Sequence, residues 1–205
     1  GAFVVDKVYK YFPDDTIFIC VVDPGVGSKR EPIFLDIGNY KFIGPNNGLF
    51  HYLFNDPEVS YKSYVIKEEF RPVKSTTFHG RDLFTPAAIE IAKNNFNIVE
   101  PINRDKLFSI PIIESGATVI TYIDGFGNIK TNISLGGDFN KKNHLKVNVN
   151  NTSRLIKVSK TFSDVADGEL LCYKGSNDTL EIAANLASAE AVLKVNVGDH
   201  IAVEK

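Results

Sequence analysis

The hydrophobic pattern of the chain changes near its middle, and this change constrains the fold more than any other feature. Before about residue 114, strand-like and helix-like stretches alternate, as in an α/β domain. After about residue 117, short stretches of alternating apolar and polar residues follow one another, separated by Gly, Asn or Asp. Short strands at regular spacing are typical of a small barrel or sandwich. We therefore expect an α/β domain over 1–114 and a β-barrel domain over 115–205.

The first half contains one continuous apolar run, Thr16–Val22, rich in β-branched residues. Such a run predicts a strand buried on both faces, as in a parallel sheet. It ends at Asp23-Pro24-Gly25, a loop signal. A helix is expected over about 83–93, with Asp82 as its N-cap. Three further strands are expected, the first two joined as a hairpin by Gly38-Asn39: 32–37, 40–43 and 61–66.

The second half predicts a series of short strands and one helix. The helix is expected over 184–193. The strands are expected over 117–123, 145–149, 155–158, 170–173, 179–183 and 200–203.

Composition limits the function classes. The chain is 43% hydrophobic and 23% charged, as in a soluble globular protein, and its net charge of -2 gives no basic footprint for nucleic acid. No apolar run approaches the roughly 18 residues of a membrane span. Cys20 and Cys172 lie inside apolar runs and are expected to be small buried hydrophobes. No Cys or His cluster has the spacing of metal ligands, so we expect no metal.

Asp23, Arg30 and His79 are candidates for a charged site in the first half. Asp23 follows a predicted strand directly, and Arg30 lies seven residues further on in the same loop. A guanidinium there keeps the carboxylate ionised and oriented, although a pair that only stabilises the loop has the same spacing. His79 precedes the N-terminus of the predicted helix, where a catalytic and a structural histidine are equally plausible.

Two glycine-rich turns are candidates for ligand contacts. Asp124–Asn128 contains a carboxylate, the aromatic ring of Phe126 and the amide of Asn128. This set suits a cationic amine together with a flat heterocycle, although a hairpin turn accounts for it equally well. Gly44-Pro45-Asn46-Asn47-Gly48 presents polar groups but lacks the signature of a phosphate loop, and turn chemistry alone can explain it.

Five short motifs, taken in order, resemble one family closely, the S-adenosyl-L-methionine (SAM) hydroxide adenosyltransferases, which are relatives of the fluorinases and chlorinases. The motifs are Val21–Arg30, Gly44–Leu49, Thr77–Asp82, Asp124–Asn128, and Gly175-Ser176 followed by Leu180–Ala183. The resemblance implies an N-terminal α/β/α sandwich domain and a small C-terminal β-barrel domain. It also implies hydrolysis of SAM to adenosine and L-methionine, with a water-derived hydroxide attacking the ribose 5′ carbon.

The resemblance also assigns roles to residues. Asp23, Arg30 and His79 match the triad of the hydrolytic members. Asp124 matches the residue that holds the methionine amino group, and Phe126 and Asn128 match residues near the adenine. Further substrate contacts are expected from Phe162, Ser176, Glu181, Asn185 and Leu186. The asparagines of Gly44–Gly48 match a family signature to which the resemblance assigns no role.

The family resemblance implies a homotrimer whose sites lie between the N-domain of one subunit and the C-domain of the next. A cytoplasmic location is expected as well. No cofactor is expected, because SAM is itself the substrate and a neutral thioether leaves without a metal. The charge and the lack of a long apolar run give no reason to expect a nucleic-acid or membrane partner. Family members open with an acidic Thr-Asp-Phe-Gly-like segment that is missing here, so we expect the chain to be a fragment. Two alternatives stay open: a SAM-dependent halide adenosyltransferase, and a non-catalytic protein that binds SAM or adenosine.

Overall fold

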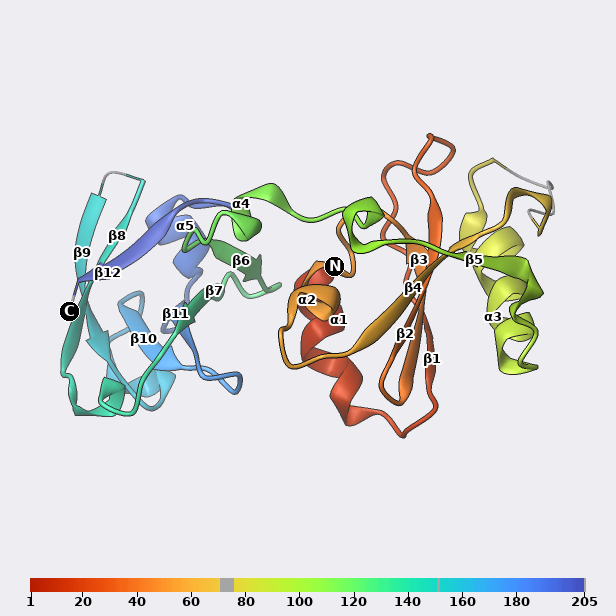
Figure 1. Ribbon diagram of the computed structural model, residues 1–205. Coiled ribbons are helices and arrows are strands. Elements are labelled where there is room, and N and C mark those ends of the chain that lie inside the picture. Colours follow the sequence, from red (N-terminus) through yellow and green to blue (C-terminus); the bar gives the residue numbers. More distant parts are fainter. Residues whose placement is uncertain (71–75, 151, 205) are drawn as a thin grey trace. The chain divides into compact units, whose positions relative to one another are not determined.

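The computed structural model describes residues 1–70, 76–150 and 152–204 (Figure 1). The chain forms two compact units, Gly1–Ile110 and Pro111–Lys205. Among the described residues, no helix is both long and apolar enough to cross a membrane.

The first unit is built around a mixed five-stranded sheet with the order β1-β3-β2-β4-β5. β1 runs parallel to β3, and the other neighbours are antiparallel. The strands are β1 (Ile17–Ile19), β2 (Pro32–Ile37), β3 (Tyr40–Pro45), β4 (Tyr61–Ile66) and β5 (Val99–Pro101). The hairpin expected around Gly38-Asn39 is confirmed, whereas the short strand β5 was not predicted.

Helices cover both faces of this sheet. Successive side chains of β2 point to opposite sides and are apolar on both, so each face needs its own cover. Ile33 and Leu35 pack in one core with α1 (Ala2–Val8) and α2 (His51–Asn55). Phe34 packs in a second core with α3 (Thr85–Ala92). The expected α/β class of this domain is confirmed, with helices on either side of the sheet.

The strand expected over 16–22 is shorter than its apolar run, and it is not buried on both faces. Among the described strands, β1 is an edge strand whose neighbour is β3, and Ile19 is 41% exposed. The Cys20 amide still donates to the Ile43 carbonyl, but the chain then leaves the sheet toward Asp23. Continuous hydrophobicity therefore overstated both the length and the burial of this strand.

The helix expected from residue 83 begins earlier and without an aspartate cap. A π-helical turn, Gly80–Phe84, precedes α3, and His79 occupies its N-cap position. Asp82 lies inside this turn, is buried, and accepts from Arg81 Nε at 2.7 Å. The prediction that Asp82 caps the helix is therefore wrong.

The second unit is a seven-stranded sheet with the order β12-β8-β9-β10-β11-β7-β6, in which only β9 and β10 are parallel. A bridge between Val119 and His200 joins its two ends, so the sheet curls into a half-barrel around a buried aliphatic core. The strands are β6 (Ile120–Ile123), β7 (Ile129–Ser134), β8 (His144–Val149), β9 (Thr152–Val158), β10 (Leu170–Lys174), β11 (Thr179–Ala184) and β12 (Ile201–Glu204).

The β class expected for the second domain is confirmed, but β7 was not predicted and the expected helix is shorter. Ala184 ends β11, and Leu186 has a φ of 53° that interrupts any helix. α5 (Ala189–Leu193) starts only after Ser188, whose hydroxyl caps the Ala191 amide. The remaining helical turns are α4 (Pro111–Glu114) and the 3-10 turns Tyr9–Tyr11, Glu68–Phe70, Phe96–Ile98, Arg104–Lys106, Phe139–Lys141 and Phe162–Asp164.

Candidate functional site

The first unit brings Asp23, Arg30 and His79 into one hydrogen-bonded group. Arg30 Nε donates to Asp23 Oδ1 at 3.0 Å, and Arg30 Nη2 donates to Asp23 Oδ2. The same Nη2 lies 2.7 Å from His79 Nδ1. Because an arginine has no acceptor, this Nδ1 must accept, which places the proton of a neutral imidazole on Nε2.

This group lies against a buried aromatic ring. The side chains of Arg30 and Asp23 are only 8% and 3% exposed. The Phe84 ring lies 5.3 Å from Arg30 Cζ and is fully buried in the core under α3. A buried guanidinium in a low-dielectric setting costs free energy unless it is paired, and the two-point contact with Asp23 supplies that pairing.

The loop between Asp23 and Arg30 folds back on itself to form this contact. The Val26 amide donates to the Asp23 carbonyl at 3.1 Å, and the Ser28 amide donates to the Gly25 carbonyl at 3.0 Å. Gly27 has a φ of 79°, a left-handed conformation that glycine adopts without strain. Two successive tight turns therefore bring residues seven apart in the chain into contact.

In the second unit, Asp124 organises the Asp124–Asn128 loop. Its Oδ1 accepts from the amides of Phe126 and Asn128, each at 3.0 Å, and its Oδ2 accepts from Asn128 Nδ2 at 3.0 Å. Partial burial acts to raise the pKa of Asp124, but these hydrogen bonds together outweigh it and lower that pKa. The carboxylate is therefore ionised, and Oδ2 retains a lone pair for a further donor.

Four of the predicted substrate-binding residues line one pocket of about 400 Å³: Phe126, Asn128, Phe162 and Leu186. Ala184 and Ala187 complete its walls. The Phe126 and Leu186 side chains are 83% and 85% exposed, and Phe162 is 42% exposed. Large apolar side chains this exposed around a concave site mark a binding surface. The pocket suits a flat apolar ring with a polar edge, because Asn128 adds an amide to an otherwise apolar lining.

Glu181 does not line this pocket and is instead buried in β11. It accepts from Lys130 Nζ at 2.7 Å and from the Tyr173 hydroxyl at 2.9 Å. A Cβ on Gly175 would overlap its carboxylate. The Tyr173 ring lies 5.7 Å from Phe162 of the pocket. Burial first, and then the Glu181 charge, raises the pKa of Tyr173, so the hydroxyl stays protonated and keeps donating.

The other two predicted substrate contacts lie away from the lining of the pocket. Asn185 Nδ2 donates to the Val165 carbonyl at 3.0 Å and to Asp167 Oδ1 at 3.2 Å, which holds the 165–169 loop. Ser176 is exposed in the turn between β10 and β11. Their roles toward a substrate stay predictions.

Sequence reasoning missed two partners of Glu181, namely Lys130 and Tyr173. Both stand directly opposite Glu181 on the neighbouring strands β7 and β10. The register of the three strands could have revealed these partners, because it places a lysine, a glutamate and a tyrosine side by side. β7 itself was not predicted, so this alignment was not accessible from the sequence.

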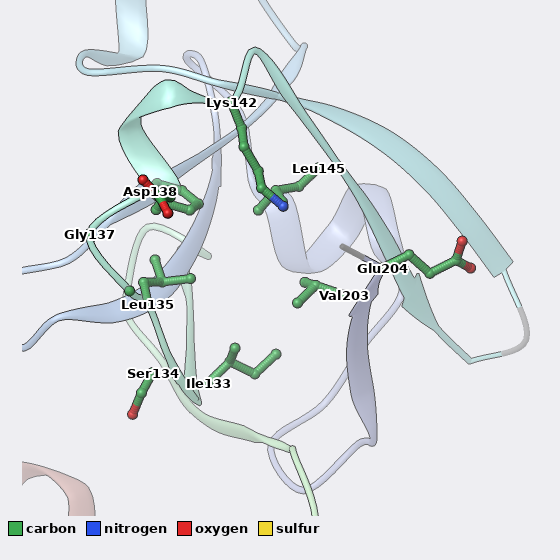
Figure 2. Close-up of a pocket in the computed structure, with 11 residues that line it drawn as sticks. Ile133, Ser134, Leu135, Gly137, Asp138, Lys142, Leu145, Val203 and Glu204 are labelled. Carbon is green, nitrogen blue, oxygen red and sulfur yellow. The ribbon is translucent and has the colours of Figure 1, made fainter.

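A second pocket, of about 510 Å³, lies elsewhere in the second unit (Figure 2). Apolar side chains form much of its wall, and Lys142 points toward its interior. Glu204 at its rim already pairs with Lys146 at 2.8 Å. Of the described residues that line it, none is a predicted site residue. Although this pocket is larger, the chemistry favours the smaller one, where four predicted residues meet.

The first unit carries a hydrogen-bonded polar group, the second carries an aromatic pocket, and the fold is that of a two-domain α/β and β protein. The chain belongs to the SAM hydroxide adenosyltransferase family: residues 1–100 match its N-terminal domain and residues 118–202 match its C-terminal domain. The resemblance read from the motifs is thus confirmed. As a member of this family, the protein is an enzyme that transfers the adenosyl group of SAM to hydroxide, which yields adenosine and methionine.

Similar proteins agree with this assignment. The chain is 31% identical to the (R)-S-adenosyl-L-methionine hydrolase of Methanocaldococcus jannaschii, over 99% of this chain and 76% of that protein. It is 28% identical to the hydrolase of the same name from Thermus thermophilus, over 97% of this chain and 79% of that protein. A solved structure of an uncharacterized conserved protein from Thermotoga maritima superposes with a TM-score of 0.79 at 28% identity, over 100% of this chain and 82% of that one.

Proposed function

We propose that the protein hydrolyses the (R) epimer of SAM, with Asp23, Arg30 and His79 acting on water and the Phe126 pocket holding the adenine. The partly buried, hydrogen-bonded Asp23–Arg30–His79 group carries this proposal. The epimer follows the names of the relatives, which are (R)-SAM hydrolases.

The reaction needs little from the enzyme at the leaving group. The water oxygen forms a bond to the ribose 5′ carbon, and the bond between that carbon and sulfur breaks. Its electron pair stays on sulfur, so the sulfonium becomes the neutral thioether of methionine. The water gives up one proton to the medium, and adenosine leaves with a new 5′ hydroxyl. The difficult step is to make water a nucleophile, and the triad is suited to that step.

Arg30 acts on the nucleophile by its charge. A fixed guanidinium stabilises hydroxide character in a nearby water without reorganising during the reaction. Asp23 holds the guanidinium plane through two parallel hydrogen bonds, which fixes its direction. His79 accepts from Nη2 and thereby restricts the guanidinium from the other side. In this arrangement Asp23 and His79 orient Arg30, and Arg30 contacts the water.

The second unit holds the substrate. The ionised Asp124 carboxylate suits the methionine ammonium group, because Oδ2 has room for one more donor. Phe126 and Phe162 offer aromatic faces to the adenine, and Asn128 offers an amide to its edge. Glu181 supports this wall through Tyr173, which packs against Phe162.

We further propose a homotrimer in which the triad of one subunit and the Phe126 pocket of another act on the same SAM molecule. The family resemblance supports this assembly. The two residue groups lie in different units of the chain, so one substrate must be reached by both.

The reaction is tested by hydrolysis in oxygen-18 water with each SAM epimer supplied separately. We expect the label in the 5′ hydroxyl of adenosine and turnover of the (R) epimer. Adenosine without label would exclude attack by water. A 5′-chloroadenosine product in the presence of chloride would favour the halide adenosyltransferase alternative.

The residue roles are tested with variants from both units. Arg30→Ala and His79→Ala should lower kcat by about 10²–10³ while SAM binding changes little. Phe126→Ala should instead weaken binding by about 10-fold or more, because stacking on an aromatic ring contributes roughly 1–3 kcal/mol. Leu155→Ala, which truncates a side chain that is 71% exposed on β9, is the matched control and should bind normally. Normal binding by the Phe126 variant would remove the adenine assignment.

A further inference from the structure

Both ends of the loop that carries Asp23 and Arg30 are held by one turn, Gly44–Gly48. Asn47 Nδ2 donates to the Val22 carbonyl at 2.9 Å, directly before Asp23. The Asn46 amide donates to the Glu31 carbonyl at 2.9 Å, directly after Arg30. The sequence singled out this turn, but neither the family resemblance nor the substrate pocket gives it a role.

The turn itself is firmly anchored. The Asn46 side chain donates to the Lys106 carbonyl at 2.7 Å and accepts from the Phe108 amide at 2.8 Å, which imitates a strand pairing. Asn47 Oδ1 accepts from the Leu49 amide at 3.3 Å. A rigid anchor of this kind can fix the position of whatever it contacts.

Asn47 acts where the sheet stops supporting the chain. β1 ends at Ile19, and the last ladder-like bond beyond it runs from the Cys20 amide to the Ile43 carbonyl. The Val22 side chain is 54% exposed, so side-chain packing restrains this residue only partly. Within the described part of the chain, the Asn47 amide is the hydrogen-bond partner that the Val22 carbonyl has. The side chain of Asn47 thus replaces the missing strand neighbour.

We propose that Asn47 is a positioning residue for catalysis: it fixes the Val22 carbonyl and thereby the placement of the Asp23 carboxylate that aligns Arg30. The inference rests on the proposed role of the triad. A two-point contact between a carboxylate and a guanidinium tolerates little displacement. A shift of about 1 Å in a catalytic group can cost about 10²-fold in rate.

The test compares Asn47→Ala with Asn39→Ala. Asn39 lies in the turn at the other end of the β2–β3 hairpin, and its exposed amide donates to Asp14 Oδ2 at 2.9 Å. The Asn47→Ala variant should have a kcat lowered by about 10–100-fold. Its KM should change by less than about twofold, and its unfolding midpoint should be nearly unchanged. Removing Asn39 should leave kcat unchanged. A fall in the unfolding midpoint with normal kcat for the folded protein would show a merely structural role.

A double-mutant cycle separates this inference from the proposed function. In an Arg30→Ala background, Asn47→Ala should cost less than about threefold, because the group that it positions is gone. If Arg30→Ala alone is nearly normal, the proposed function fails. If Arg30→Ala is impaired but the Asn47 loss multiplies fully with it, only the positioning inference fails.

Asn47→Asp covers the case in which Asn47→Ala does not fold. It has nearly the same shape and still accepts from the Leu49 amide, but it replaces the donor to the Val22 carbonyl with a charged oxygen that repels this carbonyl. It should lose at least as much kcat as the alanine variant. If neither variant folds, Asn47 serves folding and the positioning role is overturned.

Discussion

At the scale of single residues, the orientation of one guanidinium is the most consequential feature. Arg30 donates from Nε and Nη2 to the Asp23 carboxylate, and the same Nη2 also donates to His79 Nδ1. A lysine provides one charge point and no fork, so it cannot make these contacts together. The function proposed for Arg30 therefore depends on its planar geometry as well as on its charge.

We expect Arg30→Lys to lower kcat by about 10²-fold although the charge is kept, because the ammonium cannot be aligned by Asp23 and His79 at once. Steady-state kinetics at saturating SAM measure this loss. Arg104→Lys is the control, since Arg104 is exposed and, among the residues that the structure describes, its guanidinium donates to Asn55 through one nitrogen. A kcat for Arg30→Lys close to that of the control would show that charge alone suffices.

The prediction that both cysteines are buried holds for only one of them. Cys172 is fully buried, as the sequence predicted, whereas Cys20 is partly exposed after the end of β1. Burial raises the pKa of both thiols to about 12. Each thiol therefore stays protonated at neutral pH and is a poor nucleophile.

At the scale of elements, the Asp124–Asn128 loop combines structural and binding properties. The same carboxylate that suits a substrate ammonium also closes the loop by three hydrogen bonds. The sequence left a binding loop and a plain hairpin turn as alternatives. The structure shows that a single loop satisfies both descriptions, because the carboxylate has more acceptor capacity than the loop uses.

The two glycines of this loop should respond very differently to alanine. Gly127 has a φ of 81°, and a Cβ there would overlap Ser188 at the start of α5, whereas Gly125 faces open space. We expect Gly127→Ala to lower the free energy of unfolding by about 2–4 kcal/mol through strain and overlap. Gly125→Ala should change it by less than about 0.5 kcal/mol. Urea unfolding of both variants decides this, and equal stabilities would contradict the geometry of the loop.

The Asp124 carboxylate should also make stability depend on pH. Its pKa is lower in the folded unit, so its contribution is fully present above the unfolded pKa of about 4 and is lost as pH falls through the folded pKa. We expect wild type to exceed Asp124→Asn in urea midpoint at pH 7, and this advantage should shrink progressively as the pH falls below about 4.

Asp138→Asn is the control for this measurement, because the Asp138 side chain is 84% exposed and its pair with Lys141 is solvated. Its difference from wild type should be small at both pH values. An Asp124→Asn difference that stayed constant with pH would show that the carboxylate charge does not stabilise the loop.

At the scale of the whole molecule, the two halves of the proposed site lie in different units of the chain. The proposed trimer predicts complementation between variants. Mixed subunits of His79→Ala and Asp124→Asn should recover about one quarter of wild-type activity, because random exchange pairs two intact halves at one interface in four. The assay uses SAM below its KM after subunit exchange has been verified. A mixture no more active than its parents would mean that each chain supplies its whole site.

The sequence by itself determined the order of the elements, the two fold classes and the residues worth testing. The β2–β3 hairpin followed from Gly38-Asn39 between two apolar runs, and the β strands of the second half other than β7 followed from short apolar stretches between turn residues. These features are local, and local patterns record backbone preference and the face that is buried. The family motifs are also short stretches of sequence, so they can be recognised without the structure.

Only the tertiary structure decided which of these residues meet. Arg30 and His79 lie 49 residues apart and touch through their side chains, and Asn47 reaches back 25 residues to Val22. The Glu181 cluster depended on the pairing of β11 with β7 and β10. The apolar run before Asp23 was predicted to be a buried strand. In the structure β1 is an edge strand that ends at Ile19, and the Val22 carbonyl beyond it is held by the Asn47 side chain. Strand order, register and edge position arise from packing between distant segments, which periodicity along the chain does not encode.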